Sequence, residues 1–341
     1  MIPEFDNKAF SRLSELLSTP RKIVITTHHK PDGDAMGSSL ALFQFLQKMG
    51  HDATVITPSD YPDFLHWMRG NENVVIYTSD KKGSGKLIDE AEMIFCLDFN
   101  HLHRTEGMKE VLSSSKGVKV LIDHHLEPDN FADLEFSFPV SCATCEILYH
   151  MLDKLDKSLL DKEIANAIYA GIMTDTGSFR FNSTTSDTHR VIAELIDLGA
   201  NGTMVHEQIL DDFTEDRTRF LGHCLLNNLQ VVPEYRTAFI TVSVEEQRRF
   251  NNRTGDTEGL VNYALSVRGV VMACLFIEKE GLIKISLRSK GNFSVRDLAA
   301  EHFQGGGHRN AAGGKSHDSL HDSVTKFLDL LPAYKAKLLA S

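Results

Sequence analysis

Histidine and aspartate side chains recur in four short segments within the first 175 residues of the chain. These side chains are His28, Asp32, Asp34, Asp98, Asp123, His124, His125 and Asp175. Carboxylate oxygens and imidazole nitrogens, with no thiolate among them, suit Mn²⁺ or Mg²⁺ better than a structural zinc ion. The residue types therefore predict a pair of divalent ions and the hydrolytic chemistry that such ions support.

Each segment taken alone also has an ordinary structural explanation. Pro31-Asp32-Gly33 is a common turn, an aspartate at a strand end often caps the next helix, and Asp123-His124-His125 can be a solvated loop. Their shared position favours the chemical interpretation. Three segments follow predicted strands and the fourth lies where a helix gives way to a loop, so all four fall on the ligand-binding edge of one sheet.

The elements that position these residues alternate between short apolar strands and helices. After a leading helix at 5–18, the pattern predicts strands at 22–28, 53–57, 74–77, 93–98 and 118–123 and helices at 35–49, 86–91 and 105–113. This alternation is typical of a parallel α/β sheet. Helical periodicity then dominates, at 145–155, 161–173, 186–198, 203–210 and 217–226.

A second mixed region closes the chain. It holds predicted strands at 237–242, 270–277 and 282–287, helices at 258–267, 295–301 and from 319, and a glycine cluster at 305–314. We therefore predict an α/β protein with an N-terminal parallel-sheet domain and a smaller mixed α/β C-terminal domain joined by a helical linker. The predicted limits are 1–190, 191–225 and 226–341.

Composition excludes several classes of protein. A net charge of −11 argues against a globally basic surface that coats nucleic acid, and 42% hydrophobic residues can form sizeable cores. The five cysteines are scattered, and Cys142 and Cys145 lead into a helix, so we expect reduced, buried thiols. With no apolar run of the ~20 residues that span a bilayer and no signal-peptide core, we expect a cytoplasmic protein without a membrane partner.

The motifs resemble those of the DHH phosphoesterases over about residues 20–330. The N-terminal motifs are His28-x-x-Pro-Asp-x-Asp-Ala-x-Gly-Ser, Asp98, Asp123-His-His and Asp175-Thr-Gly. Arg288-Ser and Gly305-Gly-Gly-His-x-x-Ala-Ala-Gly look like elements of the associated C-terminal domain. The arrangement is most similar to the NrnA-type branch, which comprises oligoribonucleases that also remove the 3′-phosphate of adenosine 3′,5′-bisphosphate.

The resemblance implies a role for each N-terminal residue. His28 and Asp32 would bind one metal ion, with Asp98 bridging to the second. The ligands of the second ion would be Asp34, His124 and Asp175. His125 would face the substrate phosphate, and Asp123 would orient the imidazole pair. The catalytic residues are then His125, Asp98 and Asp123, and the cofactors are two divalent ions, Mn²⁺ or else Mg²⁺.

The C-terminal motif implies a site for nucleotide phosphates. The residues from Lys284 to Lys315 carry a net charge of +4, in contrast to the acidic remainder of the chain. An arginine can grip a phosphate bidentately, and consecutive glycines let backbone N–H groups approach it. The family often has a further glycine where Gln304 stands. The implied substrate-binding residues are Arg288, Ser289, Gly305, Gly306, Gly307 and His308.

The expected function is hydrolysis of short oligoribonucleotides, linear dinucleotides and adenosine 3′,5′-bisphosphate. The alternatives are an exopolyphosphatase- or pyrophosphatase-like phosphohydrolase and a non-catalytic nucleotide-binding module. Among longer relatives, cyclic-dinucleotide phosphodiesterases and RecJ-type exonucleases share the N-terminal motifs. The partners are short single-stranded RNA and nucleotide phosphates, and a homodimer is left open.

The charge distribution predicts a preference for short substrates. A net charge of −11 repels a long polyanion, whereas the basic stretch can hold only a few phosphates. We expect the fastest turnover on RNA of about two to five nucleotides, in keeping with a small pocket. A time course on a ladder of RNA lengths at fixed salt measures this, and faster degradation of a long RNA than of a trimer would contradict it.

Overall fold

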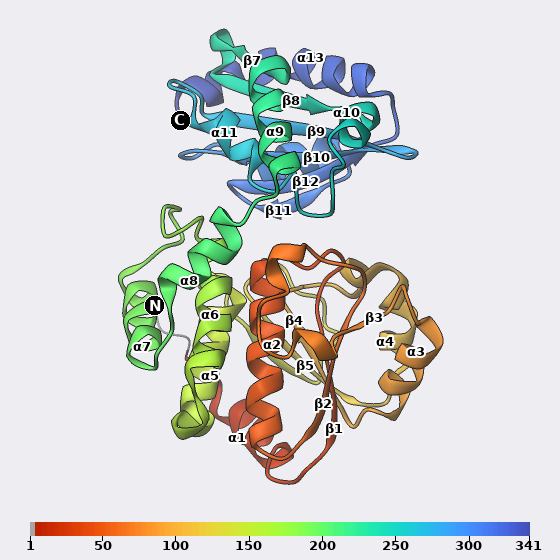
Figure 1. Ribbon diagram of the computed structural model, residues 1–341, viewed down its shortest axis with the longest axis vertical. Helices are drawn as coiled ribbons and strands as arrows, with labels where there is room; N and C mark the ends of the chain where they lie inside the picture. Colours follow the sequence, from red (N-terminus) through yellow and green to blue (C-terminus); the bar gives the residue numbers. More distant parts are fainter. Residues whose placement is uncertain (1–3) are drawn as a thin grey trace. The chain divides into compact units, whose positions relative to one another are not determined.

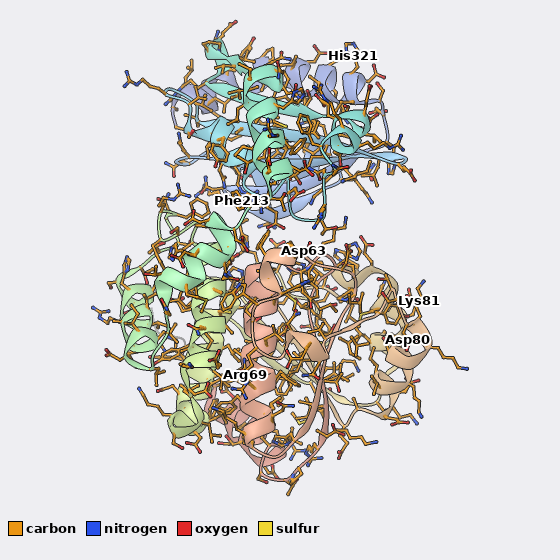
Figure 2. The ribbon with its side chains drawn as sticks, viewed as in Figure 1. Asp63, Arg69, Asp80, Lys81, Phe213 and His321 are labelled. Carbon is orange, nitrogen blue, oxygen red and sulfur yellow. The ribbon has the colours of Figure 1, made fainter. Side chains whose placement is uncertain are left out.

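The computed structural model describes residues 4–341 of the chain. These residues form two compact units, and the sequence passes from the first to the second between Asp212 and Phe213 (Figure 1). Phe213, labelled in Figure 2, is the first residue of the second unit. Each unit is built around a six-stranded sheet. No helix within the described residues is long and apolar enough to cross a membrane.

The sheet of the first unit has the predicted parallel α/β form. Its strand order is β3-β2-β1-β4-β5-β6, and every neighbouring pair is parallel. The last strand was not predicted, because its four residues lack the apolar run that marks the others. The strands are β1 Lys22–Thr26, β2 Asp52–Thr57, β3 Val75–Ile76, β4 Met93–Leu97, β5 Val118–Asp123 and β6 Leu134–Ser137.

Helices cover both faces of this sheet (Figure 1). Alternate residues of β1 enter different cores, since Ile23 and Ile25 join the core under α2, α5 and α6, whereas Val24 joins the core under α3 and α4. The helices of this unit are α1 Asn7–Leu16, α2 Gly33–Lys48, α3 Lys81–Glu90, α4 Lys109–Ser114, α5 Thr144–Asp156, α6 Lys162–Asp175, α7 Ser186–Asp197 and α8 Gly202–His206.

Some helices differ from their predicted extent. The segment predicted as one helix at 105–113 is a 3₁₀ stretch, Leu102–Met108, followed by α4. Glu106 interrupts it with a left-handed φ of 46°, which no regular helix contains. Asp80, labelled in Figure 2, accepts a hydrogen bond from Gly83 N at 2.9 Å, and so starts α3 five residues earlier than predicted.

The second unit holds a mixed sheet of order β11-β12-β10-β9-β8-β7, in which only β8 and β9 pair in parallel. A core lies on each of its faces. Its strands are β7 Leu229–Val232, β8 Thr237–Val242, β9 Met272–Lys279, β10 Leu282–Ser289, β11 Gly306–His308 and β12 Ala311–Ser316. Its helices are α9 Glu215–His223, α10 Val244–Arg249, α11 Leu260–Ser266, α12 Val295–His302 and α13 Leu320–Leu339.

Two glycines let α2, α5 and α6 approach closely beside the predicted metal ligands. A Cβ atom on Gly37 of α2 would lie 2.5 Å from the backbone oxygen of Ala167 on α6. A Cβ atom on Gly171 of α6 would lie 2.2 Å from Cys145 Sγ and 2.9 Å from Asp34 Oδ1. The backbones therefore meet at distances that only glycine permits.

We predict that Gly37→Ala lowers the free energy of unfolding by about 1–3 kcal/mol, because the added methyl group meets rigid backbone. Urea unfolding followed by circular dichroism measures the change. The matched control is Gly85→Ala in α3, where the nearest atom to a new Cβ is 4.0 Å away, and there we expect a gain of about 0.5–1 kcal/mol. Equal effects of the two substitutions would contradict the packing argument.

Candidate metal centre

The loop from β1 to α2 brings His28 and Asp32 together. Asp32 caps α2, and its Oδ1 accepts hydrogen bonds from the backbone N–H groups of Asp34 and Ala35, both at 3.1 Å. Its Oδ2 lies 3.8 Å from Nε2 of the buried His28. His28 Nδ1 lies 3.0 Å from the carbonyl oxygen of His29, which can only accept a hydrogen bond, so Nε2 carries the lone pair in the neutral ring.

Asp98, directly after β4, lies between two histidines. Its Oδ2 is 3.4 Å from His28 Nε2, and its Oδ1 is 3.4 Å from His124 Nε2. The side chain is almost fully buried, and the backbone has a left-handed φ of 64°, which aspartate tolerates better than most residues. A hydrogen bond from Asp98 N to the carbonyl oxygen of Ile122 on β5, 3.1 Å long, supports this conformation.

Asp34 is fully buried and points at the first turn of α5. Its Oδ2 accepts a hydrogen bond from Thr144 N at 2.6 Å, and its Oδ1 accepts one from Cys145 N at 2.9 Å. Ala143, the residue at the cap position of α5, has no side chain that could do this. The carboxylate of α2 therefore caps α5, where the positive end of the helix dipole favours an anion.

His124 and Asp175 complete the cluster. Asp175, the last residue of α6, has its Oδ2 3.2 Å from His124 Nε2. The same nitrogen lies 3.9 Å from Asp34 Oδ2, while His124 Nδ1 lies 3.4 Å from the carbonyl oxygen of Ser141. One imidazole nitrogen thus faces three carboxylates, including that of Asp98.

These donor atoms form two groups that share Asp98. In the first group the donor atoms of His28, Asp32 and Asp98 lie within 4.8 Å of one another, and in the second those of Asp34, Asp98 and His124 do so. Two ligands at right angles on an ion with bonds of ~2.1 Å are ~3 Å apart, close to the shorter separations here. The donor chemistry and the spacing both fit divalent ions.

Asp123 and His125 lie beside this pair of groups. His125 Nδ1 is 2.7 Å from Asp123 Oδ1 and 3.7 Å from Asp98 Oδ1. The donor atoms of these three residues form a further group within 4.8 Å. The contact with Asp123 fixes the orientation of the His125 ring.

In the second unit, strand register aligns Arg288 with His308. Ala311 of β12 pairs with Arg288 on one side and with His308 on the other, so both side chains project from the same face of the sheet. Ser289 has an internal role, because its hydroxyl donates to Phe293 O at 2.7 Å and accepts from the side chain of Asn310 at 2.9 Å.

The three glycines lie on and before an edge strand rather than in an open loop. Gly306 and Gly307 pair with β12, and Gly305 donates its N–H to the carbonyl oxygen of Ala299 at 3.0 Å. A Cβ atom on Gly305 would lie 2.0 Å from the oxygen of Gly313, whereas nothing lies within 4 Å of one on Gly306. Close backbone packing therefore accounts for Gly305.

Comparison with known proteins agrees with this geometry. The N-terminal domain of the DHH family matches residues 22–172, and the DHHA1 domain matches residues 237–337. The bifunctional oligoribonuclease and PAP phosphatase NrnA of Thermus thermophilus is 31% identical over 93% of this chain and 88% of its own length. This chain belongs to the DHH family. It is a phosphoesterase with a DHH domain in the first unit and a DHHA1 domain in the second.

Solved structures share the fold. An exopolyphosphatase-related protein from Bacteroides fragilis is 38% identical, with a TM-score of 0.93 over 98% of both chains. RecJ of Thermus thermophilus, solved in complex with Mn²⁺, is 13% identical with a TM-score of 0.53, over 100% of this chain and 55% of its own. At that identity RecJ shows a common fold only.

Burial and mutual repulsion dominate the electrostatics of the DHH domain site. Burial, followed by the charge of Asp98, raises the pKa of Asp34 to about 7, and burial with the charge of Asp34 raises the pKa of Asp175. Burial disfavours charge on Asp98 as well, but hydrogen bonds with His124 and His28 hold its pKa well below the usual value. Cations bound here would stabilise all three ionised carboxylates.

The pKa values of His124 and His125 shift in opposite directions. Burial opposes protonation of His124, yet the hydrogen bond with Asp98 and the charges of Asp175 and Asp34 raise its pKa well above the usual value. The pKa of His125 is lowered, because burial outweighs the hydrogen bond with Asp123. His125 is therefore the more readily neutral of the two rings.

Sequence reasoning missed the residues that hold the carboxylates in place. Thr144 and Cys145 bind Asp34 through their backbone N–H groups, and Thr144 Oγ1 also donates to Asp98 Oδ1 at 3.1 Å. Backbone donors leave no mark on side-chain identity, and 110 residues separate Asp34 from Thr144, so local sequence gives no signal.

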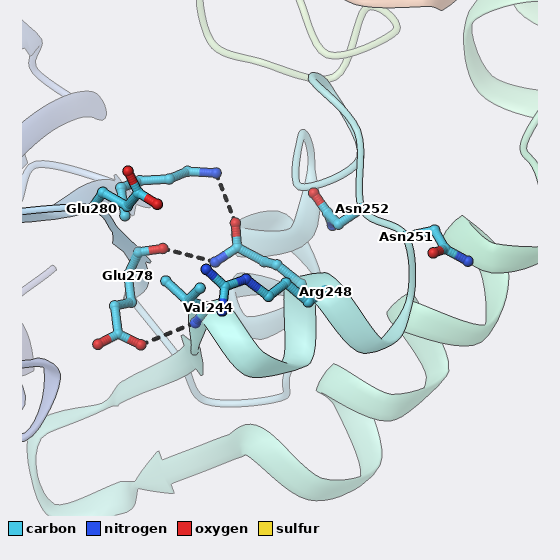
Figure 3. Close-up of a pocket in the computed structure, with 8 residues that line it drawn as sticks. Val244, Arg248, Asn251, Asn252, Glu278 and Glu280 are labelled. Carbon is cyan, nitrogen blue, oxygen red and sulfur yellow. Dashed lines mark hydrogen bonds between the residues drawn. The ribbon is translucent and has the colours of Figure 1, made fainter.

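A hollow in the DHHA1 domain lies apart from the predicted nucleotide-binding residues. Its volume is about 480 Å³, and Arg248, Asn252, Glu278 and Glu280 are among the residues that line it (Figure 3). The Glu278 carboxylate is turned toward Val244 and accepts a hydrogen bond from its backbone N–H at 2.9 Å. Arg288, Ser289 and His308 are not among its eight lining residues. Both signs of charge line it, so it is not the basic phosphate site that the sequence predicts.

We predict that Thr144→Val weakens cation binding by about 10–100-fold, because the substitution removes the hydroxyl that orients Asp98 while it keeps the side-chain shape. Titration of the metal-free protein with Mn²⁺ in a calorimeter measures the affinity. The control is Thr105→Val, a buried threonine whose hydroxyl bonds only to the carbonyl oxygen of Leu102. Unchanged affinity in the Thr144 variant would show that this hydrogen bond does not position Asp98.

Proposed function

We propose that the chain is a manganese-dependent phosphoesterase that hydrolyses short oligoribonucleotides and removes the 3′-phosphate of adenosine 3′,5′-bisphosphate. The observation that carries this proposal is the Asp98 carboxylate, which presents one oxygen to His28 and the other to His124. A carboxylate shared by two ions would present its oxygens in this way, which supports the proposal. The name of the NrnA relative, an oligoribonuclease and PAP phosphatase, supports the substrate classes.

The ligand sets follow from the two groups of donor atoms. His28, Asp32 and one oxygen of Asp98 would hold the first ion. Asp34, His124, Asp175 and the other oxygen of Asp98 would hold the second. Mixed oxygen and nitrogen donors suit Mn²⁺, and Mg²⁺ is the runner-up.

Two such ions would lower the pKa of a bound water and neutralise charge on the phosphoryl oxygens. His125, beside the two groups of donor atoms, would transfer a proton. When Nδ1–H of a neutral His125 donates a hydrogen bond to Asp123, the lone pair of the ring lies on Nε2, which can accept a proton. Asp123 then stabilises the imidazolium that forms.

The DHHA1 domain would bind the nucleotide. Arg288 and His308 project from one face of its sheet, within a stretch of net charge +4, and they can grip a terminal phosphate. A basic patch of this size holds few phosphates, which supports short substrates. The five cysteines are free and buried, which supports the cytoplasmic location that we propose.

Removal of the shared carboxylate tests the proposal most directly. Asp98→Ala should lower kcat on trimeric RNA and on adenosine 3′,5′-bisphosphate by about 1,000-fold or more, because both ions lose a ligand. The control is Asp129→Ala, an exposed aspartate that pairs with His101 in the same unit. A variant within about tenfold of wild type would exclude a shared ligand at Asp98.

The same assay separates substrate classes and domain roles. Pyrophosphate hydrolysed faster than either nucleotide substrate would favour a phosphate-chain hydrolase instead. Arg288→Ala should raise KM for the nucleotides and spare the small generic substrate bis-p-nitrophenyl phosphate, whereas Asp34→Ala should stop turnover of all of them. Equal loss of the generic activity in both variants would refute the assignment of Arg288 to nucleotide binding.

A further inference from the structure

The loop after Asp175 has an unusual backbone. Gly177, Ser178 and Phe179 follow one another with φ values of 56°, 59° and 64°, all in the left-handed region. Residues other than glycine pay about 1–2 kcal/mol each for this conformation. Such a run persists only where surrounding contacts impose it, and here it begins two residues after the predicted ligand Asp175.

Local hydrogen bonds account for part of this conformation. Ser178 N donates to the carbonyl oxygen of Met173 at 2.7 Å, and Phe179 N donates to Thr176 Oγ1 at 3.1 Å. Both bonds tie the loop to the last turn of α6 and so to Asp175 itself. Neither bond holds the Ser178 side chain.

His206, the last residue of α8, binds that side chain from elsewhere in the unit. Its Nε2 lies 2.9 Å from Ser178 Oγ, and its Nδ1 lies 2.7 Å from the carbonyl oxygen of Gly202. A carbonyl oxygen only accepts, so Nδ1 carries the proton and Nε2 of the neutral ring accepts the hydroxyl proton of Ser178. The rings of Tyr169 and Phe179 pack against the imidazole with centroids 6.0 and 6.3 Å away, which fixes its plane.

We propose that His206 and Ser178 form a positioning pair that holds the left-handed loop and thereby directs the carboxylate of Asp175 toward His124. The proposal rests on the metal-dependent function proposed above. His206 does not touch the donor atoms, and it acts through Ser178 and the last turn of α6. Without the pair the loop relaxes, and Asp175 no longer stays 3.2 Å from His124 Nε2.

Calorimetric titration of the metal-free full chain with Mn²⁺ tests this pair without turnover. Ser178→Ala and His206→Ala should each weaken the second ion by about 10–100-fold, while the first ion binds as in wild type. The double variant should bind no more weakly than either single variant, because the two side chains act through one hydrogen bond. Additive losses would overturn the pairing.

Two conservative variants separate this role from general packing. His206→Gln keeps an acceptor near the position of Nε2 and should restore affinity, whereas His206→Asn keeps only a group near Nδ1 and should not. In kinetics, the alanine variants should lose kcat at limiting Mn²⁺, regain it at saturating Mn²⁺ and keep the KM of bis-p-nitrophenyl phosphate. Identical behaviour of the Gln and Asn variants would refute the assigned hydrogen bond.

The matched control is His189→Ala. The ring of this exposed histidine also packs on Phe179, at 5.9 Å, but it does not bond to Ser178. If His189→Ala also weakens binding of the second ion, aromatic packing on Phe179 explains the loss of affinity, and the hydrogen bond between His206 and Ser178 does not. If the wild-type chain binds two ions and every variant binds them with the same affinity, the positioning pair is refuted but the proposed function is not. If the wild-type chain binds no ion, the proposed function and the positioning pair are both refuted.

Discussion

Repulsion among buried carboxylates is the constraint around which the first unit is organised. The buried Asp34 and Asp98 and the partly exposed Asp175 all approach the single nitrogen His124 Nε2, within 3.9 Å. Aspartates gathered out of water are unstable as a group unless positive charge or N–H donors face them. The N–H groups at the start of α5, the side chains of His28 and His124, and the ions that we propose all place positive charge or N–H donors beside these carboxylates.

Close helix packing is what allows that requirement to be met. The N–H groups of Thr144 and Cys145 reach Asp34 only because α2, α5 and α6 come together at Gly37 and Gly171. Stability and function thus depend on the same contact, since a methyl group added at Gly171 would press on Asp34 itself. The arrangement of the candidate site therefore depends on close approach of the helix backbones as well as on the histidine and aspartate side chains.

The sequence predicted the parallel sheet and the edge that carries the site, because apolar runs followed by His28, Asp98 and Asp123 are local signals. It did not predict β6, whose pairing with β5 depends on partners distant in the chain. The strand at Gly306–His308 was also missed, since glycine disfavours strands unless backbone must approach closely. The ligand roles of the aspartates and of Arg288 remain predictions, as do the domain limits at 190 and 226.

The span of the chain that builds the centre has a consequence for folding. Asp34 and its backbone donors are 110 and 111 residues apart, so only a fragment that spans both Asp34 and Cys145 can form this contact. With the ligand sets that we propose, the chain must extend past Asp175 during synthesis before the second ion has all of its ligands. Bound cations then favour the native state over the unfolded ensemble by RT ln(1 + [L]/Kd), and a chelator withdraws that protection.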